Sequence, residues 1–195
     1  MEAFVLTQEI IVNPISAGNI VSIIVVIILL IASALISGSE VAYFSLSPKD
    51  INNLEEENHR YDSLVLELNK SPDKLLATIL IANNFVNVGI VILSTFIFSS
   101  LFDFNDFPLI GFITQVVGIT FLLLLFGEII PKVYASQYAA RFASFMAYPL
   151  FVLGKIFKPI SSLLINSTSF INNRFQKKTN LSIDDLSDAL DITEN

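Results

Sequence analysis

FPLIGFITQVVGITFLLLLFGEIIPK, residues 107–132, is the stretch that decides the fold of this chain. From Phe107 to Ile130 it exceeds the roughly 20 apolar residues that cross the hydrocarbon core of a bilayer. Glu128 is the only charged residue in that run, and Pro131 follows it three positions later. The run predicts a membrane-spanning helix, and it raises the question of what a carboxylate does inside one.

Two further runs have the same character, Ile20–Ile36 and Leu75–Phe102, and neither contains Asp, Glu, Lys or Arg. Over the whole chain 53% of the residues are hydrophobic and 15% are charged, and the mean hydropathy is +0.69. Soluble domains carry about 25% charged residues. We therefore expect an all-α integral membrane protein in a lipid bilayer, with three transmembrane helices.

The basic residues predict the orientation of these helices. All 11 lysines and arginines lie between the first two runs or after the third. Because cytoplasmic loops are enriched in Lys and Arg, the N-terminus is predicted outside and the C-terminus in the cytoplasm. The N-terminal segment lacks the basic region of a cleavable signal peptide, so the first run should remain as a helix. We expect a multi-pass protein of the cell inner membrane.

The segments between and after the runs predict amphipathic juxtamembrane helices on the cytoplasmic side. Apolar residues recur at helical spacing over 48–70, which indicates one helix or a helix pair. Residues 138–173 are apolar but interrupted by prolines and lysines, which favours helices lying along the inner membrane surface. A fourth spanning helix is the alternative there. The predicted organisation is an external segment at 1–19, a transmembrane domain at 20–175 with spanning helices at about 20–46, 73–102 and 107–134, and the start of a cytoplasmic linker at 176–195.

Composition also excludes several classes of function. The chain has no cysteine, which excludes disulfides and thiolate metal sites. Its net charge of −7 leaves no basic surface for nucleic acid. No catalytic serine–histidine pair, aspartate pair or HExxH motif is present, so we do not expect an enzyme. The single histidine, His59, lies in a predicted cytoplasmic segment, so zinc and copper are poorly supported.

Polar residues inside the first run share one helix face. Ser33, Ser37 and Glu40 are spaced i, i+4 and i+7. Gly38 lacks a side chain and allows close approach of another helix, so it is predicted to serve bundle packing. The alternative for each serine alone is a hydrogen bond back to its own helix.

The second run carries three asparagines, Asn83, Asn84 and Asn87. Asn83 and Asn87 share a face, and Asn84 lies beside them. Interhelical amide hydrogen bonds are the ordinary role of such residues. We assign that bundle-packing role to Asn84 and Asn87, whereas for Asn83 a role as a ligand is equally supported.

In the third run, Pro131 suggests a role for the carboxylate of Glu128. Proline has no N–H, and its ring clashes with the carbonyl four residues earlier, which is that of Gly127. We therefore predict a bend or break near Gly127 and a free backbone oxygen beside Glu128. A carboxylate, a carbonyl, serine hydroxyls and an asparagine oxygen form an all-oxygen set, which suits a hard cation such as Mg²⁺. The alternative is that Glu128 snorkels to the membrane interface.

Three motifs in this order resemble the transmembrane domain of the CNNM/CorC family of magnesium transporters: SALISGSEVAYFSLSP at 33–48, LLATILIANNFVNV at 75–88 and FGEIIPK at 126–132. The resemblance covers roughly 20–175. It implies three transmembrane helices with a belt of juxtamembrane helices, and a homodimer. It also implies a cytoplasmic CBS pair that binds ATP, which this chain does not include. The ion site that it implies consists of Ser33, Ser37, Asn83, Gly127 and Glu128.

The resemblance sets the expected function. We expect Mg²⁺ transport or efflux, with a dehydrated ion held by those oxygens, Glu40 attracting it from the cytoplasm, and Na⁺ as a coupling ion. The alternative is a non-transporting membrane scaffold or regulatory component, for example in gliding motility or protein secretion. The tail LSIDDLSDALDIT at 181–193 resembles the gliding-motility-associated (GldE-like) branch of the family.

Overall fold

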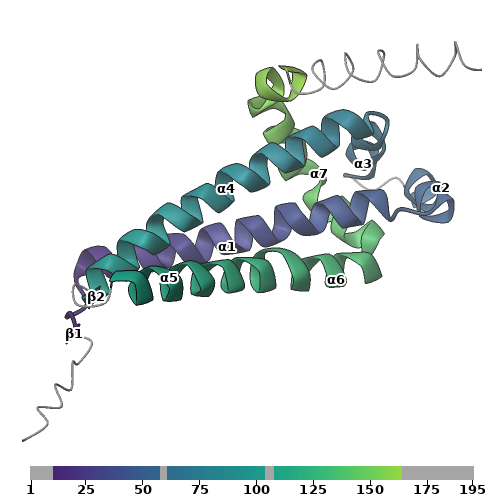
Figure 1. Ribbon diagram of the computed structural model, residues 1–195. Coiled ribbons are helices and arrows are strands. Elements are labelled where there is room, and N and C mark those ends of the chain that lie inside the picture. Colours follow the sequence, from purple (N-terminus) through teal and green to yellow (C-terminus); the bar gives the residue numbers. More distant parts are fainter. Residues whose placement is uncertain (1–10, 58–60, 104–107, 164–195) are drawn as a thin grey trace, which may run out of the picture.

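The body of the molecule consists of three long helical segments (Figure 1). The computed structural model describes residues 11–57, 61–103 and 108–163. Each of the three segments is long and apolar enough to cross a membrane, which confirms the prediction of an all-α integral membrane domain. They are α1 (Ala17–Phe44), α4 (Pro72–Leu101), and a third span, Pro108–Gln137, made of α5 (Pro108–Leu122), the π-helix η1 (Leu123–Ile129) and α6 (Ile130–Gln137).

α1 is the central element of the bundle. It contacts α4 on one side and η1 and α6 on the other, as Figure 1 shows. Its start is stabilised by Ser16, whose hydroxyl accepts a hydrogen bond from the Asn19 N–H at 3.2 Å. α4 begins with Pro72, whose fixed φ suits the first helical position.

The chain between α1 and α4 forms two short helices, α2 (Pro48–Glu57) and α3 (Asp62–Asn69). The helix-pair form of the prediction for 48–70 is therefore the correct one. Ser47 and Asp50 stabilise the start of α2: the Ser47 hydroxyl and N–H both donate to Asp50 Oδ2, at 2.6 and 2.9 Å. The Asp50 N–H in turn donates to Ser47 Oγ at 3.2 Å, which completes a capping box.

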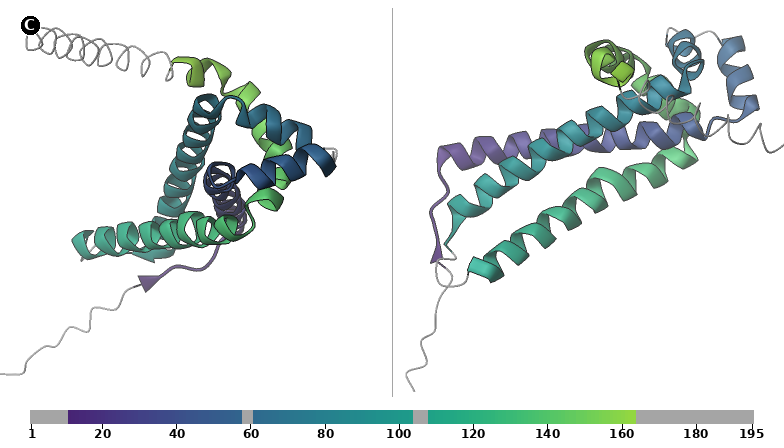
Figure 2. Two further views of the ribbon diagram at one scale, coloured as in Figure 1. Left: turned by 90° about the vertical axis from the view of Figure 1, so that its right-hand side faces the viewer. Right: turned by 45° about the horizontal axis from the view of Figure 1, so that its top comes forward.

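After the third span the chain reverses at Tyr138 and forms α7 (Ala139–Ile156). This helix packs across α1, α3 and α4 at one end of the bundle (Figures 1 and 2). Tyr43 Oη on α1 donates to the Ala143 carbonyl at 3.2 Å, and Ser144 Oγ donates to Asp62 Oδ1 on α3 at 3.0 Å. Among the described residues, the three candidate spans do not include α7, so the alternative of a fourth spanning helix gains no support.

The buried apolar core lies at this α7 end. It draws on the second half of α1, the first half of α4 and the short helices around them. At the other end many apolar side chains are exposed and available to lipid, as for Ile28, Ile92 and Phe112, although Ile90 is buried. The core residues are Ile36, Ala42, Tyr43, Leu54, Val65, Leu75, Ile79, Ala82, Ala135, Ala143, Met146, Ala147 and Leu150.

At the end of the bundle away from α7, the segment before α1 pairs with the end of α4. Strands β1 (Ile11–Val12) and β2 (Phe102–Asp103) form a two-residue antiparallel ladder. The Asn13 N–H donates to the Leu101 carbonyl at 2.8 Å. This contact was not predicted for the external segment 1–19.

Some predictions fall outside the described residues. They concern His59, the part of 138–173 beyond residue 163, and the tail at 176–195 with its branch-specific motif. The first ten residues of the external segment also lie outside.

Candidate metal site

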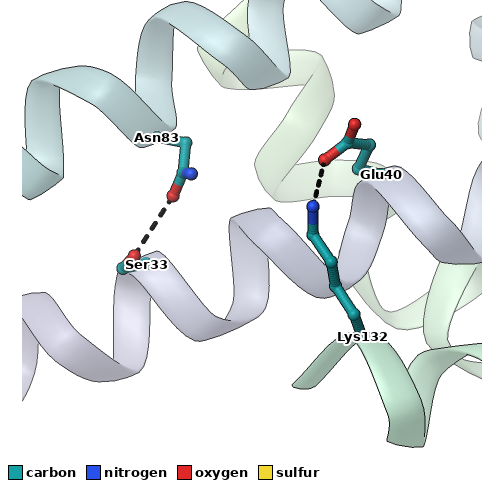
Figure 3. A network of polar contacts seen from close by, with 4 residues as sticks. All are labelled: Ser33, Glu40, Asn83 and Lys132. Carbon is teal, nitrogen blue, oxygen red and sulfur yellow. Dashed lines mark hydrogen bonds and ion pairs between the residues drawn. The ribbon is translucent and has the colours of Figure 1, made fainter. Parts of the chain in front are cut away.

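Ser33 is the centre of a polar cluster between the spanning helices. Its side chain is completely buried. Its Oγ lies 3.1 Å from Asn83 Oδ1 and 2.7 Å from Asn87 Oδ1, both on α4, and donates to them (Figure 3 shows the contact with Asn83). A hydroxyl carries one proton and cannot serve two acceptors fully. The cluster therefore places one hydroxyl oxygen and two amide oxygens close together between the helices.

Gly127 brings the backbone of the third span to the same place. A Cβ added to Gly127 would lie 3.1 Å from Ser33 Oγ, a closer contact than side chains normally tolerate. The absence of a side chain thus lets η1 approach α1. The structure therefore brings together three of the five predicted ligands, Ser33, Asn83 and Gly127.

The π-helix η1 contains both Gly127 and Glu128. The Ile130 N–H donates to the Leu125 carbonyl, five residues back. Pro131 has no N–H, so it can satisfy neither the Gly127 carbonyl four residues back nor the Phe126 carbonyl five residues back. Short π-helical segments are frequent at functional sites. The sequence predicted a bend or break near Gly127. The structure has a π-helix there instead, and the three parts of the span continue along one course in Figure 1.

Ser37 lies one turn beyond Ser33 on α1. It is 1% exposed, and its Oγ has no hydrogen-bond partner in the described part of the chain. The neighbouring Ser39 behaves differently, because its hydroxyl donates to the Leu35 carbonyl of the same helix at 2.7 Å. A buried hydroxyl without a partner costs about 1–3 kcal/mol. Ser37 Oγ is thus a buried polar group without a hydrogen-bond partner among the described residues.

Glu128, next to Gly127, is half-buried. Within the described ranges its carboxylate makes no hydrogen bond or ion pair, and the structure shows no direct contact between it and Ser33 or Ser37. A carboxylate without a partner in a membrane-spanning segment indicates a functional site.

Glu40 is paired, which sequence reasoning did not foresee. Its Oε2 accepts a hydrogen bond from Lys132 Nζ on α6 at 2.9 Å (Figure 3). Both side chains are about one third exposed, at 31% for Glu40 and 37% for Lys132. Glu40 lies one turn beyond Ser37, so the ion pair joins α1 to α6 close to the polar cluster. The available signal was that each residue is the first charge beyond the apolar part of its run.

The three residues assigned to bundle packing have different environments. Asn87 forms the expected interhelical hydrogen bond, to Ser33. Gly38 does accept a close neighbour, but the neighbour is the Phe142 ring of α7, whose Cζ would lie 2.7 Å from an added Cβ. Asn84 is exposed and has no hydrogen bond in the described part of the chain, so the structure adds no support to its predicted role in bundle packing. It lies about 100° around α4 from Asn83.

The donor set limits which metals fit. No group of three or more His, Cys, Asp and Glu side chains occurs within residues 11–57, 61–103 and 108–163. The polar cluster offers neutral oxygens, and Glu128, the next residue after Gly127 on η1, adds a half-buried carboxylate that does not contact Ser33 or Ser37. This set suits a hard cation better than zinc or copper, which favour nitrogen and sulfur ligands.

Comparisons with known proteins give a consistent result. The sequence model of a family described as "CNNM: Cyclin M transmembrane N-terminal domain" matches residues 24–195. A UPF0053 protein of Haemophilus influenzae is 34% identical over 141 residues, which make up 72% of this chain and 32% of that protein. The UPF0053 inner membrane protein YfjD of Escherichia coli is 32% identical over 124 residues, or 62% of this chain and 28% of that one.

A eukaryotic relative carries a functional name. The protein called metal transporter cnnm-4 of Caenorhabditis elegans is 30% identical over 144 residues, which are 69% of this chain and 29% of that protein. This chain therefore spans about a third of the length of the relatives that it matches.

Proposed function

The chain belongs to the family of the cyclin M transmembrane N-terminal domain, and we propose that it moves divalent cations, Mg²⁺ in particular, across the inner membrane. Two observations support membrane transport of a metal. One relative is named as a metal transporter and another as an inner membrane protein. The described chain also has three candidate spans with a polar cluster between them.

The convergence of Ser33, Asn83 and the Gly127 backbone beside the unpartnered Ser37 hydroxyl carries the proposal. In the proposed site, these four residues and Glu128 hold the ion through oxygen atoms. Glu128 supplies the negative charge. Mg²⁺ loses its water reluctantly, so a charged ligand is needed to offset the cost of dehydration. ATP would act only through cytoplasmic domains of a longer protein, and Na⁺ is the proposed coupling ion.

Glu40 is proposed to guide the ion to this site from the cytoplasm. The ion pair with Lys132 affects how Glu40 can serve that role. An approaching cation competes with the Lys132 ammonium for the Glu40 carboxylate. The ion pair therefore opposes binding of the cation to Glu40 until Lys132 moves away.

A homodimer is also proposed, and Asn84 supports it. An exposed amide about 18 Å from the start of a spanning helix, at 1.5 Å per residue, lies within the hydrocarbon and needs a polar partner. A second copy of the chain can supply one. Gly38 is not part of this interface, because Phe142 of the same chain covers it. Since the chain has no cysteine, Val88→Cys, one turn beyond Asn84, should crosslink in membranes, and monomer alone would contradict the dimer.

Mg²⁺ flux into proteoliposomes tests the transport function. The parent chain should move Mg²⁺ down its gradient, Glu128→Gln should not, and Lys49→Gln, an exposed change on α2, should behave as the parent. If the folded parent moves no Mg²⁺ under Mg²⁺ or Na⁺ gradients in either direction, the transport proposal is wrong and a scaffold role is favoured.

A further inference from the structure

A cavity of about 430 Å³ lies at the α7 end of the bundle, where α3, the start of α4 and α7 meet the helical residues 158–163. None of the proposed metal ligands lines it. Its volume falls within the range of pockets that bind small molecules, about 300–1,000 Å³. Its lining includes three lysines, two hydroxyl residues and a glycine: Lys74, Lys155, Lys158, Thr78, Ser161 and Gly154.

Three lysines from separate segments surround this cavity: Lys74 on α4, Lys155 on α7 and Lys158 in the following turn of helix. Glu67 is the carboxylate among the lining residues. None of the three lysines forms an ion pair within the described residues. Lys155 Nζ instead lies 4.3 Å from the centroid of the Phe151 ring. Positive charges gathered without partners repel one another, so an anion placed among them is stabilised.

A helix start and hydroxyl groups also line the same cavity. The buried Thr78 Oγ1 donates to the Lys74 carbonyl at 2.8 Å and lies 3.5 Å from Ser161 Oγ, so its proton is already used within the chain. Ser71 precedes α4 but makes no side-chain capping bond to it, so the first N–H groups of this long helix lack that partner. Lysine ammonium groups and free helix N–H groups are donors that bind phosphate oxygens.

We propose that this cavity, the lysine pocket, binds the phosphate group of an anionic phospholipid. The start of a membrane-spanning helix lies at the level of the lipid headgroups, and the basic residues mark this end of the bundle as cytoplasmic. Basic pockets beside spanning helices on that side suit anionic headgroups. Leu75, Leu150 and Phe151 form apolar walls along which an acyl chain can lie. A free phosphate ion presents the same oxygens but does not use these walls.

The test is a titration of the purified chain in neutral detergent, without Mg²⁺, so that it is independent of the proposed transport. Short-chain phosphatidylglycerol should raise the thermal unfolding temperature and remain bound in native mass spectra, whereas phosphatidylcholine should do neither. Removal of one pocket lysine, Lys155→Gln or Lys158→Gln, should weaken phosphatidylglycerol binding about fivefold. Lys49→Gln removes an exposed lysine outside the pocket and should have no effect.

A second variant tests the cavity without changing charge. A Cβ on Gly154, which lines the cavity, would meet Thr78 Oγ1 at 3.9 Å, an ordinary van der Waals contact. Gly154→Leu should fill the pocket and abolish lipid binding while the chain stays folded. Equal binding of phosphatidylcholine, or unchanged binding in both the lysine and the Gly154 variants, would overturn the proposal. Inorganic phosphate that stabilises the chain as well as phosphatidylglycerol does would overturn the assignment to a lipid.

Discussion

The two halves of α1 have different surroundings. In the first half, isoleucines such as Ile24, Ile27 and Ile28 are more than half exposed, at 52%, 51% and 58%, and suit a surface covered by lipid. In the second half, Ser33 and Gly38 are buried beneath Gly127 of η1 and Phe142 of α7. The polar groups of the helix thus lie where protein surrounds them. Polar groups at membrane depth are tolerated under that condition.

This difference indicates which half of α1 tolerates changes of side chain. In the first half, an apolar side chain of another shape meets fluid lipid, which adapts to it. In the second half, each side chain meets a defined neighbour, so volume and hydrogen bonding both matter. Substitutions should therefore separate the two halves of the bundle sharply.

The largest effect on stability is expected at Gly38. Gly38→Leu forces a side chain into the space of the Phe142 ring, which should cost about 1–3 kcal/mol. The matched control is Gly118→Leu on α5, where an added Cβ meets no atom within 4 Å and should be neutral. Thermal unfolding in detergent measures both. Equal stability of the two variants would contradict the difference between the two halves. Partial rescue of Gly38→Leu by Phe142→Ala would show that the Phe142 ring causes the loss of stability.

Ser37→Ala should act in opposite directions on stability and binding. Without Mg²⁺ it removes a buried hydroxyl that has no partner in the described chain, so stability should rise by about 1 kcal/mol. With Mg²⁺ the affinity should fall severalfold because one ligand is lost. Ser39→Ala, which removes a hydrogen bond to its own helix, is the control for binding and should leave the affinity unchanged. If Ser37→Ala lowers stability without Mg²⁺, the hydroxyl has a structural partner in the protein and is not a free ligand for an ion.

A smaller effect is expected from interhelical hydrogen bonds. Asn87→Ala removes the 2.7 Å contact with Ser33 and should cost about 0.6–1.7 kcal/mol. Gln115→Ala removes a 2.8 Å bond to Thr95 in the lipid-exposed half and should cost less, because this hydrogen bond is exposed whereas that of Asn87 is part-buried. Resistance to unfolding in a denaturing detergent gives the order of the two. The reverse order would contradict the view that the α7 half is the more tightly specified.

The sequence predicted the features that depend on runs and on spacing. The three spans lie within a few residues of their predicted bounds, because long apolar runs outweigh local propensity in a bilayer. Ser33, Asn83 and Gly127 meet as expected, since each lies on the polar face of its own helix.

The features that were missed depend on how the helices are rotated and what covers them. Asn84 differs from Asn83 only by one step around α4, and a single-helix pattern does not show which step faces α1. The pairing of Lys132 with Glu40, and the cover that Phe142 gives to Gly38, join segments that are far apart in the chain. The π-helix was not predicted, and a bend or break was expected in its place, because a proline predicts the loss of a hydrogen bond but not the register that replaces it.

The smallest effect is expected outside the membrane, where α2 starts in water. Hydrogen bonds from the Ser47 hydroxyl, and then from its N–H, hold the pKa of the Asp50 carboxyl below its ordinary value. Because the pKa is lower in the folded state, this stabilisation is complete above about pH 4 and is lost as the pH falls through the folded pKa. Ser47→Ala should cost α2 about 0.5 kcal/mol at neutral pH. Hydrogen exchange of the α2 amides measures it, and unchanged exchange would rule out the cap.

The most direct test of the central claim is a calorimetric Mg²⁺ titration of the purified parent chain and of Glu128→Gln. The substitution keeps the size of the side chain and one carbonyl oxygen but removes the negative charge. The account predicts that the parent binds Mg²⁺ and that Glu128→Gln does not, while both unfold at the same temperature without Mg²⁺. If Glu128→Gln binds Mg²⁺ as tightly as the parent, Glu128 is an interfacial residue and the proposed site is wrong.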